Sequence, residues 1–341
     1  MIVKMWPLQK ESTTNQYTSL ILHDGVEYKP HVWNIKNVLD FKFDVFHMHW
    51  PETYLNLPKF YQRLLGTLFV LLFLIVCKIL SKKIVWTVHN FKPHENHNVR
   101  MSELYRTLLV RLVDKFIFLT DVSKHEFLKI YDVNESKLTV IHHPLYEIEE
   151  NCFNNPEDKN SSLENKYLFF GLIRPYKNVG LLMREFIKND ADSLLIIMGG
   201  CSDILASELV SLKERIDFKD RIKFKFGRYD EKKLQQELNE CKGVIIPYSD
   251  IMNSGVLYRA ITAGVNVLLP RMKYTEEVIH SLKYQGAAFY EPPLDVDDIL
   301  NFSNTALDRC NKVDFYTYNK RIKVAHSEVY QLLIQNKRSI K

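Results

Sequence analysis

The sequence predicts an α/β protein made of two doubly wound, Rossmann-like domains that face each other across a cleft. Three observations lead to this prediction. Strand-like apolar runs alternate with helical patterns along the chain, which is typical of parallel sheets covered by helices. The 341 residues are more than one hydrophobic core usually serves. A polar stretch without periodicity separates two alternating halves.

The first half contains four strand-like segments. They are rich in β-branched and aromatic residues and cover residues 44–50, 83–90, 115–120 and 137–144. Apolar residues at helical spacing fill the intervals 101–115 and 121–131. In the second of these, Ser123 is a suitable N-cap.

The second half repeats the alternation and sets the expected boundaries. Its strand-like segments are residues 166–171, 193–200, 222–227, 242–248, 265–270 and 286–291. We expect a first domain over residues 1–150, a linker over 151–166, a second domain over 167–325, and a C-terminal helix or tail over 326–341. Ligands of such domains bind at the carboxyl ends of the strands.

One segment, Leu64 to Cys77, is uniformly apolar and is followed by "KILSKK". A membrane-spanning helix needs about 20 such residues, and this run is shorter. Three interpretations stay open: a helix buried against a sheet, a helix that dips into a membrane interface beside the trailing lysines, and a true span.

Composition and charge narrow the function classes. The net charge of +5 suits anionic small molecules or an anionic membrane surface. No long basic block and no nucleic-acid motif is found, so we expect no nucleic-acid partner. The five cysteines form no Cys-x-x-Cys pair, and the N-terminus has no apolar signal-peptide core. Both features favour a cytoplasmic, reducing compartment.

The stretch "GLIRPYKNVGLLMREF", Gly171 to Phe186, predicts an anion site. Gly171 ends a strand, which lets a ligand approach the backbone. Arg174 and Lys177 offer donors that suit phosphate oxygens, and the helix that follows would add its N-terminal dipole. A solvated loop with ordinary surface cations is the alternative.

A second motif, "PYSDIMNSGVLYRAITAGVNVLLP" (Pro247 to Pro270), runs from a strand end through a polar loop into a short helix. Asn253, Ser254 and Gly255 stand where the helix begins, so their amides can bind an anion or a sugar hydroxyl. Gly264 is a good residue to end that helix. Plain α/β packing explains the same pattern.

Together these stretches resemble GT-B glycosyltransferases of the family 4 kind. "GLIRPYK" is similar to their "G-x-[LI]-x-x-x-K" loop, and "NSGVLYRAITAGVNVLLP" to their donor-sugar loop and helix. "GRYDEKKLQQELNECKGVIIPYSD" resembles the stretch between those two motifs. In the first half, "TTNQYTSLI", "FHMHWPE" and "WTVHNFKPHE" resemble three loops of a subset of these enzymes. The resemblance extends from about Asn15 to about Pro293.

One departure concerns the two glutamates, with seven residues between them, that family 4 enzymes usually carry in the donor loop and helix. Aligned on Gly264, Ile251 and Arg259 occupy their positions. The stereochemical outcome therefore stays open. The "NSG" form resembles enzymes of bacterial surface-polysaccharide assembly, which implies a GDP-sugar such as GDP-mannose or GDP-fucose before a UDP-sugar.

Polar clusters also follow two strands of the first half. His47, His49 and Glu52 follow the first, and His89, Asn90, His94 and Glu95 follow the second. A metal site is one interpretation, but the spacings match no zinc motif and the resemblance implies no bound metal or cofactor. We expect a general base or sugar-binding groups instead; caps and salt-bridge partners remain the structural alternative for the glutamates.

The candidate site residues fall into three groups. We expect the catalytic groups to be His89, Glu52 and Glu95. We expect the donor-binding groups to be Gly171, Arg174, Lys177, Asn253, Ser254 and Gly255. We expect the acceptor-side groups to be Asn15, Tyr17, His49 and Asn90.

The resemblance implies a metal-independent transferase. Its first domain would bind the acceptor, a hydroxyl of a lipid-linked saccharide, and its second domain would bind a nucleotide sugar. The protein would sit peripherally on the inner face of the cytoplasmic membrane. A UDP-sugar epimerase of the same fold and a non-catalytic partner subunit are the alternatives. The sequence disfavours a dehydrogenase, because no G-x-G-x-x-G follows any strand.

Overall fold

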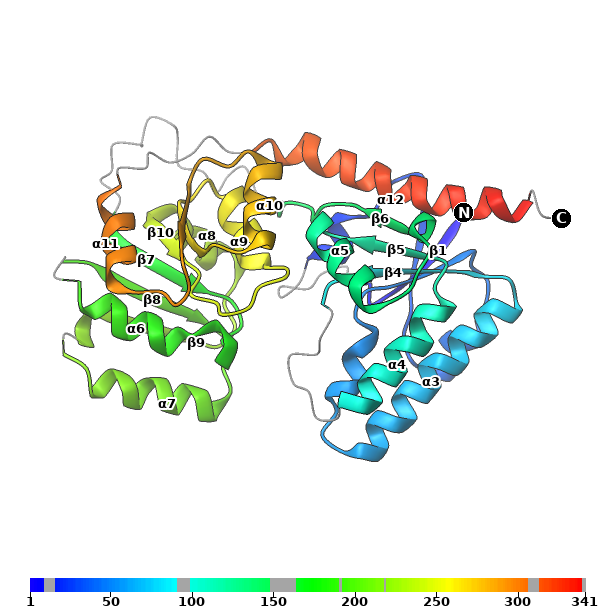
Figure 1. Cartoon of the computed structure of the whole chain (residues 1–341), viewed down its shortest axis with the longest axis horizontal. Helices are drawn as coiled ribbons and strands as arrows, with labels where there is room; N and C mark the ends of the chain where they lie inside the picture. The colour runs from blue at the N-terminus through cyan, green and yellow to red at the C-terminus, as the bar shows by residue number, and fades with distance from the viewer. Residues whose placement is uncertain are drawn as a thin grey trace. The chain divides into compact units, whose positions relative to one another are not determined.

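The computed structural model describes residues 1–8, 16–90, 99–147, 164–189, 192–217, 219–305 and 313–338. The chain forms two compact units (Figure 1). The N-terminal unit contains Met1–Pro144 and Thr317–Lys341, and the C-terminal unit contains Leu145–Tyr316. Each unit is an α/β layer structure with one parallel sheet of six strands. The predicted pair of doubly wound domains is therefore confirmed.

The N-terminal sheet has the strand order β2-β1-β3-β4-β5-β6, and every pairing is parallel. Its strands are β1 (Ile2–Trp6), β2 (Glu27–Pro30), β3 (Val45–Met48), β4 (Lys83–Val88), β5 (Lys115–Phe118) and β6 (Leu138–Val140). Its helices are α1 (Tyr17–Leu20), α2 (Ile35–Val38), η1 (Pro51–Asn56), α3 (Phe60–Ile79), α4 (Val99–Leu112), α5 (Asp121–Ile130), η2 (Glu135–Lys137) and α12 (Phe315–Arg338).

Strand alternation divides the N-terminal core between the two faces of this sheet. On β3, Phe46 faces Phe73 of α3, with ring centroids 5.0 Å apart. Its neighbours Val45 and His47 point to the other face. There Val45 shares a buried cluster with Tyr330 of α12. His47 therefore lies under α12 and not under α3.

The C-terminal helix α12 is the main difference from the expected domain boundaries. The sequence analysis ends the second domain at residue 325, whereas the structure returns the chain to the N-terminal unit at Thr317. Ile322, Val329 and Tyr330 recur at helical spacing and are buried in the N-terminal core. Of the expected linker, residues 151–163 lie outside the described residues, and Glu164–Lys166 belong to the next strand.

The C-terminal sheet has the order β12-β11-β10-β7-β8-β9, again all parallel. Its strands are β7 (Glu164–Phe170), β8 (Leu194–Gly199), β9 (Ile222–Phe226), β10 (Cys241–Ile245), β11 (Val267–Pro270) and β12 (Ala287–Tyr290). Its helices are η5 (Pro175–Lys177), α6 (Val179–Ile187), α7 (Asp203–Glu214), η6 (Lys219–Arg221), α8 (Glu231–Glu240), α9 (Gly255–Thr262), α10 (Lys273–Leu282) and α11 (Val296–Asn304).

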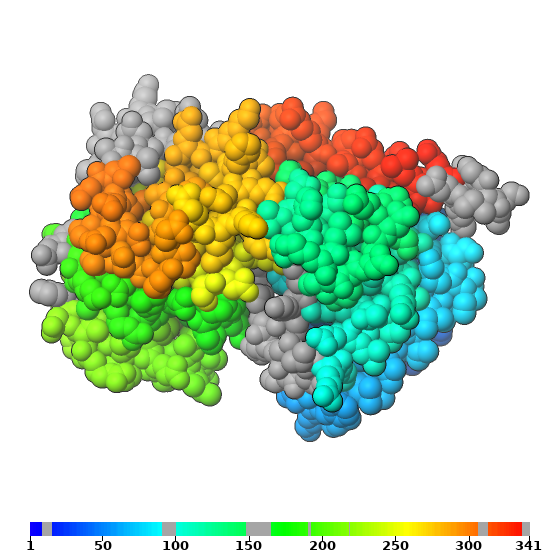
Figure 2. All heavy atoms as spheres, viewed as in Figure 1, coloured from blue at the N-terminus to red at the C-terminus, as the bar shows by residue number. Residues whose placement is uncertain are grey.

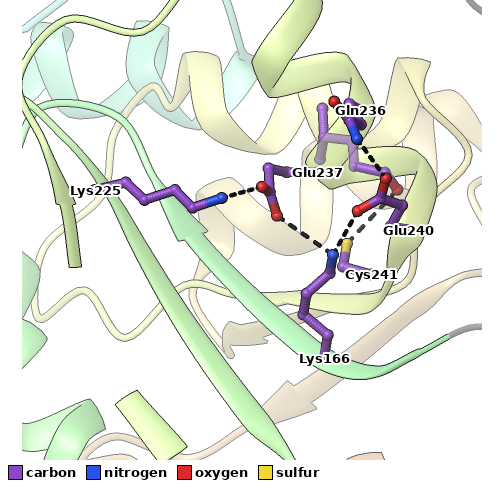
Figure 3. Close-up of polar contacts among 7 residues, drawn as sticks. Lys166, Lys225, Gln236, Glu237, Glu240 and Cys241 are labelled. Carbon is purple, nitrogen blue, oxygen red and sulfur yellow. Dashed lines mark hydrogen bonds and ion pairs between the residues drawn. The ribbon is translucent and has the colours of Figure 1, made fainter. Parts of the chain in front are cut away.

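A partly buried ion-pair network ties α8 to the C-terminal sheet (Figure 3). The Lys166 Nζ atom of β7 lies 2.7 Å from Glu240 and 3.4 Å from Glu237, both on α8. Lys225 of β9 pairs with Glu237 from the other side. Lys166 is 4% exposed. Because a buried ammonium needs such partners, the network fixes α8 against β7 and β9.

Helix α3 carries the apolar run that sequence analysis left open. It packs on α4 and on the sheet through Val70, Phe73 and Leu74, which are buried. Its opposite face is exposed, with Leu65, Leu72 and others open to solvent. By length and composition alone, α3 is the one helix of the described ranges that could cross a membrane, a test that core helices of soluble proteins also pass.

Candidate functional site

The carboxyl edge of the C-terminal sheet is tightly turned at Gly171, which directly follows β7. Its φ of 98° lies in the region that favours glycine. The neighbouring strand β8 ends at Gly199, and a Cβ atom there would lie 1.9 Å from the carbonyl oxygen of Gly171. No side chain fits between these two strand ends, so bare backbone forms this edge.

Lys177, the last residue of η5, is a buried cation beside that edge. A Cβ atom at Gly171 would lie 3.7 Å from its Nζ atom. Nζ also lies 4.8 Å from the centroid of the Tyr248 ring. Burial, and secondarily the charge of Arg174, lowers the pKa of Lys177 to about 8. A bound anion would restore the ammonium form, which is what a phosphate-binding lysine requires.

Arg174 occupies a different environment from Lys177. Its side chain is exposed, and it lines a cavity of about 210 Å³ between η5, α6 and α7 together with Asn178 and Arg184. Its positive charge still lowers the pKa of Lys177. The two predicted cations are therefore neighbours, but only the lysine is enclosed.

The N-terminus of α9 meets the same place. Ser254 caps the helix by accepting a hydrogen bond from the amide of Leu257 at 3.4 Å. Val256, in the first turn, lies 2.9 Å from the position of a Cβ atom at Gly171. The structure thus brings Gly171, Lys177, Ser254 and Gly255 together. A helix N-terminus beside an ammonium group is a suitable site for an anion.

Gly255 has no room for a side chain, because a Cβ atom there would lie 2.5 Å from the hydroxyl oxygen of Tyr146. Asn253, just before the cap, is half-buried. The contact holds the first turn of α9 close to Tyr146. The donor-binding role of Gly255 stays a prediction, and the sequence carries no signal for its contact with Tyr146.

Arg259 stands at one of the two positions where the resembled enzymes carry a glutamate. It is 6% exposed, pairs with Glu231 at the start of α8, and lies 5.3 Å from the centroid of the Tyr146 ring. Its Nε and Nη1 atoms are buried without a hydrogen-bond partner. Ile251, at the other position, is buried and apolar. The carboxylate beside α9 thus comes from Glu231.

The carboxyl edge of the N-terminal sheet gathers histidines. His47, on β3, lies 2.7 Å from the Tyr330 hydroxyl through Nδ1 and 2.8 Å from the Thr87 hydroxyl through Nε2. His49 Nδ1 lies 3.3 Å from His89 Nε2. These side chains are buried. The hydrogen bonds join β3, β4 and α12 at one edge of the sheet.

His89 directly follows β4 and is held by aromatic rings. It stacks on Trp50, with ring centroids 4.4 Å apart, and meets the edge of Tyr17 at 4.7 Å. The Tyr17 ring also contacts His49 and His143. Burial drives the pKa of His89 well below its ordinary value, so the ring is neutral at neutral pH. It is therefore better suited to hydrogen bonding than to accepting a proton.

Glu52 lies in η1, three residues beyond His49, and is half-buried. Burial raises the pKa of its carboxyl group to about 7, although the charge of Arg106 acts in the opposite direction. A carboxylate with a pKa near the working pH matches the requirement for a general base.

The remaining predicted residues stand as follows. Asn90 follows His89 and is half-buried. Asn15 and Glu95, and His94 with them, lie outside the described residues. Within the described ranges, no group of three or more His, Cys, Asp or Glu side chains is arranged to hold a metal ion.

Comparison with solved structures decides the fold. The chain superposes on Anabaena Alr3699/HepE in complex with UDP-glucose with a TM-score of 0.69 and 14% identity, over 96% of this chain and 99% of that one. WaaG, a glycosyltransferase involved in lipopolysaccharide biosynthesis, matches with a TM-score of 0.59 and 12% identity, over 98% of each chain. The chain has the GT-B fold.

Two curated proteins resemble most of this chain in sequence. Both are GDP-mannose:glycolipid 4-beta-D-mannosyltransferases of Xanthomonas campestris pv. campestris. One is 29% identical over 265 residues, or 76% of this chain and 70% of the relative. The other, from strain ATCC 33913, is 26% identical over 288 residues, or 83% and 78%. No protein-family model matches the chain. These names agree with the predicted resemblance to surface-polysaccharide enzymes.

Arg106, whose charge lowers the pKa of Glu52, is not among the residues predicted from the sequence. It lies on α4, on the face of Ser102, Tyr105 and Leu109, all of which are buried. A cation within the buried face of an amphipathic helix is a signal that the sequence carries, because residues three and four apart share a face. Tyr146, Tyr248 and Glu231 have no such signal.

Proposed function

We propose that this chain is a glycosyltransferase that moves a mannosyl residue from GDP-mannose to a hydroxyl of a lipid-linked saccharide. The observation that carries the proposal is the anion site of the C-terminal unit, where Lys177 is buried beside Gly171 and the start of α9. A leaving nucleoside diphosphate needs this kind of stabilisation. The named donor and glycolipid acceptor of the two relatives supply the substrate classes.

The chemistry follows as an inverting displacement. Glu52 accepts the proton of the acceptor hydroxyl while that oxygen attacks the anomeric carbon. The bond to the diphosphate breaks, and GDP leaves with the electron pair. Lys177 and the amides of Ser254 and Gly255 receive the developing charge. The apolar Ile251 in place of a glutamate supports a base from outside the C-terminal unit. His89 is kept for hydrogen bonding to substrate.

We further propose that the enzyme is peripheral to the cytoplasmic face of a membrane. A lipid-linked acceptor requires access to a bilayer, and α3 offers an exposed stripe of Leu65, Leu72 and Ile79 at seven-residue spacing. Lys78, Lys82 and Lys83 follow at its C-terminal end. Apolar residues beside lysines are the pattern of interfacial helices.

A thermal-shift panel tests the donor. GDP and GDP-mannose should raise the unfolding temperature more than UDP and UDP-glucose, because a ligand that binds only the native state stabilises it. Transfer of mannose to a lipid-linked saccharide should follow, and should persist in EDTA. Arg174→Ala combined with Lys177→Ala should abolish transfer in a folded protein. Stabilisation by UDP alone, or normal rates in the double variant, would refute the proposal.

A further inference from the structure

Arg106 is a buried cation that the proposed chemistry does not use. It is 7% exposed, and its Nε and Nη2 atoms are buried without a hydrogen-bond partner. An arginine side chain stays positively charged and offers five N–H donors in a rigid fork. Buried donors of this kind are almost always satisfied in native structures. Two donor nitrogens without partners on an enclosed cation therefore indicate a ligand with acceptor oxygens.

The surroundings place this cation at the candidate base. Tyr105, its neighbour on α4, donates a hydrogen bond of 2.9 Å from its hydroxyl to the carbonyl oxygen of Pro51, the first residue of η1. This bond ties α4 to the short helix that carries Glu52. The charges of Arg106 and Glu52 influence each other, yet the ion pairs of the described ranges include none between them. Glu52 therefore does not occupy the Arg106 fork.

The adjoining elements indicate which anion is bound. Helix η1 leads within a few residues into α3, and α3 packs against α4. The exposed apolar face of α3 is the proposed membrane contact, and Figure 2 shows the blue and cyan atoms of this region at the surface. An anion that reaches Arg106 from this side would come from a lipid, and the guanidinium fork matches phosphoryl oxygens.

We propose that Arg106 binds a phosphoryl group of the acceptor's lipid diphosphate and so positions the saccharide at Glu52. The proposal rests on the proposed function for the identity of the acceptor. It assigns to the N-terminal unit an anion site of its own, distinct in residues from Lys177 and α9. Arg106 is here a substrate-binding residue, and no step of bond making passes through it.

The test uses farnesyl diphosphate as a short lipid diphosphate, with saturating GDP present to fill the donor site. Isothermal titration calorimetry compares the full-length protein with Arg106→Gln, Arg106→Lys and Arg111→Gln. Arg111 is an exposed arginine on the same helix and serves as the matched control. Loss of the charge-assisted contact should weaken binding about 10- to 100-fold in Arg106→Gln, less in Arg106→Lys, and not in Arg111→Gln. Binding of GDP to each variant checks that it is folded.

Two further ligands show whether the diphosphate or the hydrocarbon chain is the source of the affinity. Inorganic pyrophosphate should show the same dependence on Arg106, and farnesol should show none. Equal affinity of the Arg106→Gln and Arg111→Gln variants for farnesyl diphosphate would overturn the proposal, as would equal dependence for farnesol. A change in the pH profile of transfer without a change in diphosphate affinity would reduce Arg106 to a counter-ion of Glu52 and equally overturn it.

The kinetic test separates this inference from the proposed function. If Arg106 holds the acceptor, Arg106→Gln should raise the KM for acceptor and leave the KM for GDP-mannose unchanged. Arg106-dependent binding in a protein that fails to transfer mannose would refute the function and leave the site. Mannose transfer with an unchanged acceptor KM would refute the site and leave the function.

Discussion

Glu52 depends for its proposed chemistry on its surroundings. The same side chain in water would have a pKa of about 4.3 and would be a weak base at neutral pH. Partial burial in η1 raises this pKa to about 7. His89 shows the opposite effect of the same cause, since burial lowers its pKa and keeps the ring neutral. An unperturbed histidine is more basic than an unperturbed glutamate, but burial makes Glu52 the stronger base of these two groups.

The Glu52→Gln variant should lose about 100-fold or more in transfer rate, the usual contribution of a general base. Because only the ionised carboxylate accepts a proton, the wild-type rate should rise with pH and level off above about 7. The variant should show no such rise. Measuring kcat/KM from pH 5.5 to 8.5 checks this, with Glu103→Gln, an exposed glutamate on α4, as the control. An unchanged rate in Glu52→Gln would exclude its role as base.

Gly255 makes a second prediction at this scale. A methyl group there would meet the Tyr146 hydroxyl at 2.5 Å, so Gly255→Ala must displace the Tyr146 side chain or the start of α9. We expect a loss of about 1–3 kcal/mol in the free energy of unfolding, as for other overpacked sites, and weaker GDP binding.

The control is Gly180→Ala in α6, where the nearest atom to the new methyl group is 3.4 Å away. There we expect a gain of about 0.5–1 kcal/mol. Urea unfolding and GDP titration measure both variants. Full GDP affinity in Gly255→Ala would show that the first turn of α9 does not bind the donor.

Among the elements, α3 has two faces with different partners. Its buried face packs on the sheet and on α4, while Leu65 and Leu72 are 62% and 60% exposed. A single face of this width is what an interfacial helix presents, whereas a spanning helix is apolar on all sides. Arg63, within the helix, is 9% exposed and donates to the carbonyl oxygen of Leu57.

The double variant Leu65→Asn, Leu72→Asn should sediment less with vesicles that contain phosphatidylglycerol. The wild type should bind these vesicles more than neutral phosphatidylcholine, and added salt should weaken the binding. Ile204→Asn, an exposed isoleucine of α7 that is 76% exposed, is the control. Equal sedimentation of all three proteins would contradict the membrane role of α3.

Helix α8 makes a prediction about stability. Lys166→Met leaves the carboxylates of Glu237 and Glu240 without their buried cation. Removing one partner of such a pair should cost about 3 kcal/mol in the free energy of unfolding. Lys219→Met, which breaks an exposed pair with Glu214, should leave the stability unchanged. Urea unfolding of both variants tests the difference, and equal stability would mean that the network in Figure 3 is not stabilising.

At the scale of the whole molecule, buried histidines make the N-terminal unit sensitive to acid. Burial is the main cause of a lowered pKa in each of them. They are His31, to about 3, His143 and His326, to about 4, and His47, His49 and His89, well below the ordinary value. Of the twelve histidines in the sequence, one, His280, belongs to the C-terminal unit.

The free energy of unfolding should therefore fall as the pH drops from about 6.5 toward 4. Between these pH values the histidines bind protons in the unfolded chain but stay neutral in the folded chain. Each such histidine lowers the free energy of unfolding by about 1.4 kcal/mol per pH unit. Glu52 acts in the opposite direction but is one group against six. All four tryptophans (Trp6, Trp33, Trp50 and Trp86) belong to the N-terminal unit. Their fluorescence during urea unfolding at pH 7.5 and 5.5 measures the effect, and equal midpoints would contradict it.

The sequence predicted most of the fold because each parallel strand is a short apolar run bounded by polar residues. The expected strands at residues 83–90 and 193–200 correspond to β4 and β8. It also pointed to His89, since a polar residue just after such a strand must lie at the carboxyl edge of the sheet. Lys177 was predicted from the loop that follows β7. Strands β1 and β2 were not predicted. Lys4 interrupts the apolar residues of β1, and β2 (Glu27–Pro30) contains no apolar run.

The sequence by itself determined two parallel α/β sheets, the residues at their carboxyl edges and the apolar character of α3, because these follow from local periodicity and composition. The tertiary structure alone decided the strand order, the return of α12 to the N-terminal unit, and which residues lie next to Arg106 and Tyr146. It also decided which carboxylate has a pKa near 7. Burial, and the pKa values that depend on it, are set by residues distant in the chain, and no local pattern records them.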